Sequence, residues 1–371
     1  EDVHDFAWAA SPHFVYVEEP FSAPNVPGVK IKLYLDLAHR AWKDRYMYAA
    51  KRSLAKYAEW FGAYPYSTLS VVVPPADANG AGGMEYPTLV TAWGASKKAP
   101  GLELERVVVH EIGHQFWYGI VASNEFEEAW LDEGFTSYAE DLAMADIFGQ
   151  TPNLPIEASY MTSPAPLSRF SWQYDGHGQY ADNVYTRAKL VLAGIERQIG
   201  REQMIRVLGT YFDRWKFKHP TTKDFQTVLE EVTGTSWSDY FDQFVYGGKM
   251  TDYAVERIHI RRVEQDGRPA YENTVVVRKY DGHYTAVPIV FRFADGTSVE
   301  KSWDGKDAQM QFKLISRSPL EWVAIDPERT IVLENRRINN FMRTSVDGKW
   351  NVRLNIGFAK LIETIIGAVA W

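Results

Sequence analysis

Two histidines and two glutamates are spaced so that they could hold and use a metal ion. His110 and His114 are four positions apart, so on a helix both imidazoles point to one face, and Glu111 lies beside them. A catalytic zinc ion takes three protein ligands and keeps its fourth position for water, and Glu133 is the natural third ligand. The pattern therefore predicts one zinc ion, with Glu111 as the general base. The alternative, a buried helix with two hydrogen-bonded histidines, predicts none of the partners found downstream.

A glycine-rich turn upstream of this motif could approach a bound peptide. Residues 79–90 indicate a turn that runs into a strand, and Pro87, which has no N–H to donate, is typical of an edge strand. An edge strand beside a cleft can pair with an extended peptide, and Gly82 and Gly83 would let that peptide come close. Glu85 would then point toward the bound chain or away from it. The alternative is a surface hairpin with a solvated glutamate.

Composition limits the other classes of function. Of 371 residues, 46% are hydrophobic and 24% are charged, close to the average for soluble globular proteins, and the length allows two or three domains. We expect no nucleic acid partner, because the 40 Lys and Arg are outnumbered by 48 Asp and Glu and no long basic run is present. Cysteine is absent, so a metal must use His and carboxylate ligands.

The beginning of the chain gives a weaker indication of its origin. It starts at Glu1 without a basic stretch and an apolar run, so we expect no signal peptide within the given residues. We expect a processed chain or, in preference, a fragment of a longer one. A cysteine-free chain fits a bacterial cell envelope or periplasm as well as a cytosol, and we favour the envelope.

Hydrophobic periodicity predicts the elements that would position these residues. Strands are predicted over 29–37 and 69–73, and helices over 45–61, 102–119, 126–148, 184–199, 202–216 and 221–232. Thr221 and Asp224 resemble a capping box at the start of the last helix. Residues 150–183 are predicted to form a long loop, in which Trp172, Tyr174 and His177 are candidates for the wall of a cleft.

After Gly248 the hydrophobic pattern changes from helical to strand-like, and this change predicts how the chain is divided into domains. Six β-rich runs predict a small β-sandwich: 253–264, 273–280, 286–293, 298–303, 310–314 and 321–325. We expect an α+β chain in four parts: the tail of a preceding domain over 1–29, a catalytic domain over 30–248, the sandwich over 249–338 and a C-terminal segment over 339–371. Residues 354–371 predict an amphipathic helix that contacts a partner or a membrane surface.

Three motifs together resemble the zinc aminopeptidase family typified by aminopeptidase N, in the gluzincin clan. They are Gly82-Gly83-Met84-Glu85-Tyr86-Pro87, His110-Glu111 with His114, and Trp130-Leu131-Asp132-Glu133-Gly134-Phe135. Their order matches, and so do the eighteen residues between His114 and Glu133. The resemblance implies a thermolysin-like catalytic domain, with a mixed sheet followed by helices.

The resemblance also implies a substrate and further site residues. The substrate would be a peptide with a free amino terminus, which Glu85 binds within a motif that includes Gly82, Gly83 and Met84. A tyrosine at the head of a helix beyond the third ligand would stabilise the oxyanion. Tyr185 fits this place, and Tyr180 is the second choice.

The chain departs from the family pattern in several places. Tyr86, Asp132, Arg187 and Ala188 replace the usual residues of their motifs. We also expect no counterpart, within the given residues, of most of the family's N-terminal β-domain, which usually supplies a second group for the substrate's amine, or of its large helical C-terminal domain. Two other functions therefore stay open: an endopeptidase or other hydrolase of the same clan, and a binding protein with a silent site.

Overall fold

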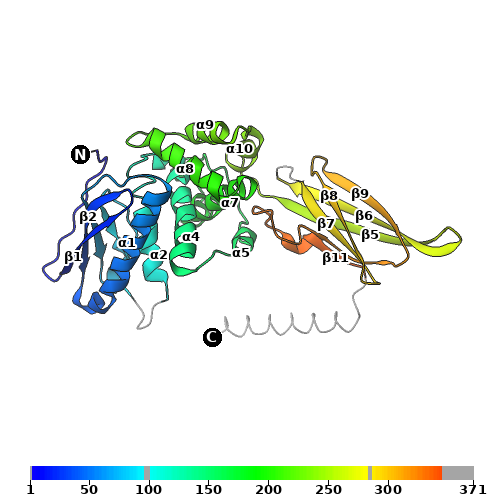
Figure 1. Cartoon of the computed structure of the whole chain (residues 1–371), viewed down its shortest axis with the longest axis horizontal. Coiled ribbons are helices and arrows are strands. Elements are labelled where there is room, and N and C mark those ends of the chain that lie inside the picture. The colour runs from blue at the N-terminus through cyan, green and yellow to red at the C-terminus, as the bar shows by residue number, and fades with distance from the viewer. Residues whose placement is uncertain (1, 96–100, 283–285, 345–371) are drawn as a thin grey trace. The chain divides into compact units, whose positions relative to one another are not determined.

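The computed structural model describes residues 2–95, 101–282 and 286–344. They form two compact units, one of Glu1–Met250 with Ile331–Asn335 and one of Thr251–Thr330 with the residues from Arg336 onward. The predicted α+β fold is confirmed, with a sheet and helices in the first unit and strands in the second (Figure 1). The predicted C-terminal helix lies outside the described residues. Within them, none of the helices combines the length and the hydropathy that crossing a bilayer needs.

A mixed four-stranded sheet begins the first unit. Its order is β1 (Val15–Ala23), β2 (Val26–Leu35), β3 (Thr68–Val73) and β4 (Leu89–Thr91). Strand β1 is antiparallel to β2, whereas β2, β3 and β4 are parallel. Alternating residues bury one face of β2, and the crossover from β2 to β3 runs through helix α1 (Lys43–Trp60). The predicted edge position is confirmed for β4, which ends the sheet.

Strand β1 was not predicted. We expected residues 1–29 to be the tail of a preceding domain and predicted no strand in them, but Val15–Ala23 pairs along β2, and Val15, Val17 and Phe21 pack against the core. Pro20 argues against a strand in the sequence, yet β1 is an edge strand, where a missing N–H is tolerated. The proposed origin of these residues in a preceding domain stays a prediction.

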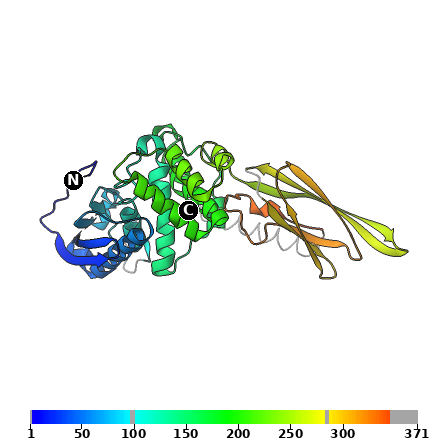
Figure 2. The same cartoon turned by 45° about the horizontal axis from the view of Figure 1, so that its top comes forward.

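Helices follow the sheet and carry the candidate site (Figure 2). In chain order they are α2 (Glu103–Gly113), α3 (Glu125–Glu128), a π-helical turn (Trp130–Gly134), α4 (Phe135–Phe148), α5 (Leu154–Ser159), α6 (His177–Ala181), a second π-helical turn (Asp182–Arg187), α7 (Ala188–Ile199), α8 (Arg201–Trp215), α9 (Thr222–Thr233) and α10 (Ser238–Phe244). The capping box of Thr221 and Asp224 is confirmed.

Two predicted boundaries are wrong. Helix α2 ends at Gly113, not at 119, because the chain turns there: Gly119 N donates to His114 O at 2.8 Å and Tyr118 has a φ of +121°. The predicted loop 150–183 contains α5 and α6. Asn153 caps α5 by accepting from Ile156 N, which offsets the helix-breaking composition around it.

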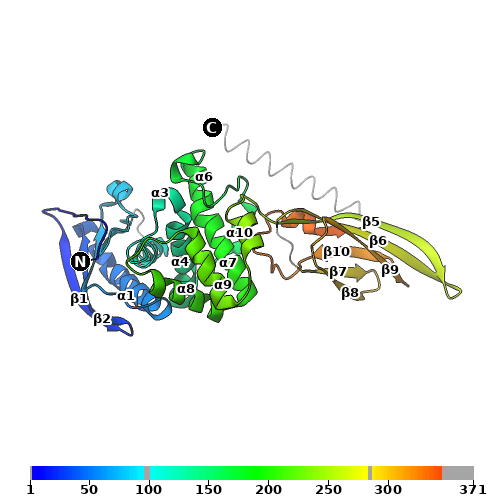
Figure 3. The same ribbon diagram turned by 90° about the horizontal axis from the view of Figure 1, so that it is seen from above.

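The described residues of the second unit form seven strands in two sheets, one more than predicted. Figure 3 shows these sheets. One sheet has the order β5 (Asp252–Gln265), β6 (Arg268–Asp281) and β9 (Gln309–Ser316), and the other has the order β11 (Phe341–Arg343), β10 (Leu320–Ile325), β7 (Val287–Phe293) and β8 (Ser298–Trp303). Aromatic pairs join the two inner faces: Tyr253 lies 5.4 Å from Trp303, and Phe291 lies 5.3 Å from Phe312, between ring centroids. The predicted sandwich is therefore present.

Candidate metal centre

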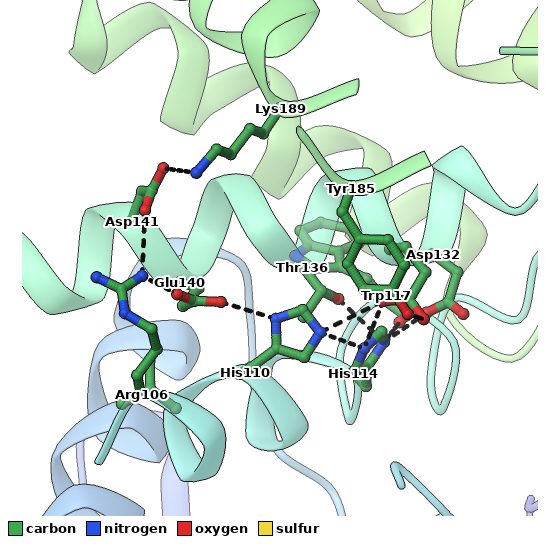
Figure 4. Close-up of polar contacts among 12 residues, drawn as sticks. Arg106, His110, His114, Trp117, Asp132, Thr136, Glu140, Asp141, Tyr185 and Lys189 are labelled. Atoms are coloured by element: carbon green, nitrogen blue, oxygen red, sulfur yellow. Dashed lines mark hydrogen bonds and ion pairs between the residues drawn. The ribbon is translucent and has the colours of Figure 1, made fainter. Parts of the chain in front are cut away.

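Figure 4 shows His110 and His114 side by side at the end of helix α2, and Glu133 lies against both of them. His110 lies in the last turn of α2, His114 directly follows its end, and Glu133 lies in the first π-helical turn. The two Nε2 atoms are 3.0 Å apart, and they lie 3.3 and 3.2 Å from Glu133 Oε2. Ligand atoms around a tetrahedral zinc ion are separated by about 3.4 Å. The three side chains therefore already have the geometry of a zinc site.

Glu133 is held as an anion by its surroundings. Its burial alone would raise the pKa, but His114 and His110 lie against the carboxylate and outweigh burial, so the pKa falls well below its usual range. Two imidazole nitrogens and one ionised carboxylate are a donor set that zinc prefers. The donor atoms of these three residues therefore fit zinc in type, and the distances between them fit zinc as well.

Close helix packing brings Tyr185 to the same carboxylate. The two π-helical turns carry Glu133 and Tyr185, and such turns are frequent at functional sites. A Cβ atom on Gly134 would lie only 2.4 Å from the Cβ of Ala188, so glycine permits this approach. The Tyr185 hydroxyl donates a hydrogen bond to Glu133 Oε1.

Hydrogen bonds fix the orientation of both imidazole rings. His110 Nδ1 lies 2.9 Å from Glu140 Oε2, and His114 Nδ1 lies 2.5 Å from Asp132 Oδ1 and 3.2 Å from Thr136 Oγ1. A carboxylate accepts only, so each Nδ1 carries a hydrogen and each Nε2 is left directed at the centre, where it can bind a metal ion once it is deprotonated.

Ion pairs extend this network away from the centre. Glu140 accepts from Arg106 Nη1, which also lies 3.5 Å from Asp141 Oδ1. Asp141 pairs with Lys189 at 2.8 Å, and Lys189 pairs with Glu157 at 2.9 Å. Figure 4 shows this series of contacts, which runs from His110 through Glu140 and Asp141 of α4 to Lys189 of α7.

Glu111 faces the centre with an unsatisfied oxygen. The side chain is 4% exposed, and its Oε2 has no hydrogen-bond partner among the described residues. Burial raises the pKa of Glu111 to about 7, against the opposing effect of His110 and His114. A buried acceptor without a partner is costly, so its place in a functional cavity suggests a ligand or a water molecule as its partner.

A cavity of about 330 Å³ opens over these residues. It is lined by Gly82, Gly83, Glu85, Trp93, Glu103, Arg106, Val107, His110, Glu111, His114, Glu133, Glu140 and Tyr185. Such a cavity is within the usual size range of small-ligand pockets.

Residues 46–244, just over half of the chain, match the peptidase family M1 domain. The chain belongs to peptidase family M1. This confirms the predicted family and, with it, the prediction of a metallopeptidase.

Curated relatives of this M1 chain are aminopeptidases of greater length. Aminopeptidase M1-B of Oryza sativa subsp. japonica is 24% identical over 331 residues, which cover 81% of this chain and 34% of the relative. Glutamyl aminopeptidase of Homo sapiens is 29% identical over 138 residues, which cover 34% of this chain and 14% of the relative. The chain thus spans about a third of the length of the first of these.

Two solved structures share the fold. Aminopeptidase A of Legionella pneumophila, in complex with aspartic acid, has a TM-score of 0.63 at 14% identity, covering 86% of this chain and 38% of that one. A mutant of an M1 zinc metallopeptidase from Deinococcus radiodurans has a TM-score of 0.52 at 21% identity, covering 64% of this chain and 53% of that one.

The structure brings most of the predicted site residues of this M1 chain to the cavity. Gly82, Gly83 and Glu85 line it, but Met84 does not: its side chain is exposed, and its backbone pairs with Thr91. The structural reason for Gly82 also differs from the predicted one, because a Cβ atom there would lie 2.3 Å from Ala92 O of the chain's own backbone.

Of the predicted aromatic site residues, one lines the cavity and the others do not. Tyr185 lines the cavity, whereas Tyr180 does not and lies 6.3 Å from Tyr185 between ring centroids. Trp172, Tyr174 and His177, predicted for a cleft wall, are also absent from its lining.

Glu140 and Arg106 were missed in the sequence, although their spacing contains a signal. Glu140 follows Glu133 by seven residues, and Arg106 precedes His110 by four. These intervals place side chains on one face of a helix.

We expect Glu140→Gln to weaken zinc binding by about ten- to a hundredfold, because it removes the charge that orients and polarises His110. The measurement is a zinc dissociation constant by chelator competition. Glu127→Gln, an exposed substitution on α3, is the matched control. Equal affinity in both variants would show that Glu140 does not support the metal.

Proposed function

We propose that this chain is a zinc-dependent aminopeptidase domain that releases N-terminal residues from peptides. The supporting observation is that Glu85, Glu111 and the triad of His110, His114 and Glu133 line one cavity. A metal-binding triad, a buried base and a further carboxylate are what hydrolysis of a peptide held by its ammonium group requires.

His110, His114 and Glu133 would hold one zinc ion. When bound, the ion supplies a Lewis acid that lowers the pKa of a coordinated water and polarises the scissile carbonyl. The aminopeptidase relatives and the zinc metallopeptidase with the same fold support this assignment.

Glu111 would move the proton. Glu111 lines the cavity and its Oε2 has no partner among the described residues, so the carboxylate can accept the proton of the attacking water and then deliver it to the leaving nitrogen. Burial keeps bulk water away from this oxygen, and the raised pKa makes it a more effective proton acceptor than an exposed carboxylate.

Tyr185 would stabilise the oxyanion. Its hydroxyl already lies against Glu133 Oε1 at the centre, and burial, followed by the Glu133 charge, raises its pKa well above the usual value. The hydroxyl therefore stays protonated and can donate to the developing negative charge.

We expect Tyr185→Phe to lower kcat by about a hundred- to a thousandfold, because it removes one oxyanion donor and leaves the ring. Tyr180→Phe is the comparison, and it should retain near-native turnover because Tyr180 does not line the cavity. Steady-state rates with leucine p-nitroanilide measure both. The reverse outcome would transfer the role to Tyr180.

Glu85 would bind the substrate's ammonium group. Burial raises the pKa of its carboxyl, which shows that the ionised form lacks the solvation of a surface glutamate. Its backbone is fixed by Gln115 Nε2, which donates to Glu85 O at 2.9 Å. A cation supplied by the substrate would offset the cost of keeping the carboxylate charged.

The test compares aminoacyl amides with their N-acetylated counterparts in the zinc-loaded protein. We expect hydrolysis of the free amines, with at least about a hundredfold lower kcat/KM after acetylation, because acetylation removes a cation that binds a partly desolvated carboxylate. Glu85→Gln should reduce this preference by at least about tenfold, and Glu111→Gln is the blank. Equal or faster cleavage of acetylated substrates would overturn the proposal in favour of an endopeptidase.

A further inference from the structure

One face of helix α2 forms the floor of the cavity. Glu103, Val107 and Glu111 recur every four residues, and Arg106, His110 and His114 follow the same spacing, so the six side chains lie on neighbouring rows of one face. Glu103 is seven residues before His110, which corresponds to about 10 Å along the helix axis. The cavity thus extends well beyond the metal centre, toward the start of α2.

Glu85 marks the opposite end of the cavity. The carboxylate oxygens of Glu85, Glu125 and Asp132 lie within 4.8 Å of one another, and Asp132 accepts from His114. Glu85 therefore lies on the His114 side of the centre. If the substrate's amine lies at Glu85 and its scissile bond at the triad, the part toward Glu103 receives the residue that follows the cleaved bond.

One carboxylate in this cavity has no direct ion pair among the described residues. Glu133 belongs to the metal triad, Glu140 pairs with Arg106, and the proposed roles account for Glu85 and Glu111. Glu103 is exposed and has no ion-pair or hydrogen-bond partner among the residues that the structure describes. The nearby cation, Arg45, interacts with Glu103 electrostatically but makes its ion pair with Glu105, so the Glu103 carboxylate is open to a cation of the substrate.

The cavity wall between the metal centre and Glu103 is suited to an aliphatic side chain. Val107 lies between the centre and Glu103 along α2, and Trp93 lines the same cavity. A lysine or arginine side chain has a long apolar stem and a terminal cation, so it can cover these walls and still reach a carboxylate.

We propose that the cavity selects for lysine or arginine at the second residue of the peptide, with Glu103 as the residue that determines this preference. The inference rests on the proposed function, because that function fixes which end of the cavity takes the leaving peptide. An acidic second residue would meet Glu103, and the cation that lines the cavity, Arg106, already pairs with Glu140 and lies near Asp141.

The experiment uses three dipeptide amides with a constant first residue: Leu-Lys-NH2, Leu-Leu-NH2 and Leu-Glu-NH2. We expect kcat/KM to fall in that order, by about threefold per step, as for a partly exposed ion pair. The preference should weaken in about 0.5 M salt. In Glu103→Gln the Lys-to-Glu ratio should approach one, and in Glu103→Lys it should invert.

Controls separate this inference from the proposed function. Glu127→Gln should keep the native order and hydrolyse leucine p-nitroanilide, which has no charged second residue, at the native rate. A native protein that hydrolyses leucine p-nitroanilide but shows no charge preference refutes the role of Glu103 and leaves the aminopeptidase proposal intact.

A binding measurement tests the role of Glu103 even if the protein hydrolyses none of these amides. In zinc-loaded Glu111→Gln, calorimetry should show about tenfold tighter binding of Leu-Lys-NH2 than of Leu-Glu-NH2, and adding Glu103→Gln should remove the difference. Equal binding in the Glu111→Gln protein would overturn the inference. Failure to hydrolyse any free amine, with the binding preference present, would instead overturn the proposed function.

Discussion

Replacing Glu111 by glutamine should lower kcat by a factor of about 10³ or more, with little change in zinc content. Positioned general bases contribute about 10² to 10⁴ in rate. The amide has nearly the same shape as the carboxylate, so the buried site next to His110 and His114 keeps its packing. It cannot accept the proton that Oε2 would take from the attacking water.

Leucine p-nitroanilide hydrolysis and metal analysis on the same sample measure this effect. Glu127→Gln, which makes the same chemical change at an exposed position on α3, should retain native rates and zinc content. A Glu111→Gln protein that keeps more than about a tenth of the native kcat would show that another group acts as the base.

Glu133→Ala should have the second large effect, the loss of the metal itself. Zinc affinity should fall by more than the ten- to hundredfold typical of second-sphere changes, because only two imidazoles remain. The substitution also removes the acceptor of the Tyr185 hydroxyl. Turnover should fall by at least about 10³.

Zinc stoichiometry after equilibrium dialysis measures this loss, with native protein and Glu127→Ala as controls. Near-native secondary structure by circular dichroism would show that the loss is local. A Glu133→Ala protein that retains one tightly bound zinc ion would contradict the assignment of the third ligand.

Local helical geometry explains why the candidate site was largely predictable. His110 and His114 need only one helical turn to share a face, so their spacing alone indicates a metal site. The position of Glu133 depends on how the following helices pack on α2. Its interval from His114 was recognised through the resemblance to the family. The structure adds that all three side chains meet within hydrogen-bonding distances.

Features that depend on tertiary contacts were not predictable. A π-helical turn around Glu133 requires the close approach of Gly134 to Ala188, which no local pattern encodes. Strand β1 was hidden by Pro20, since the sequence does not show that the strand lies at an edge. The boundaries of the predicted domains stay predictions. Most of the helices and the strands of the sandwich were recoverable from apolar periodicity, whereas the mixed sheet was expected from the resemblance to the family.

X-ray anomalous scattering at the zinc edge tests the central claim most directly. In crystals of the zinc-loaded protein, we predict one peak at about 2.0 to 2.2 Å from His110 Nε2, His114 Nε2 and the carboxylate of Glu133. A peak elsewhere would contradict the account, for example between Glu85, Glu125 and Asp132, whose oxygens also lie within 4.8 Å of one another. So would the absence of any peak in the presence of excess zinc.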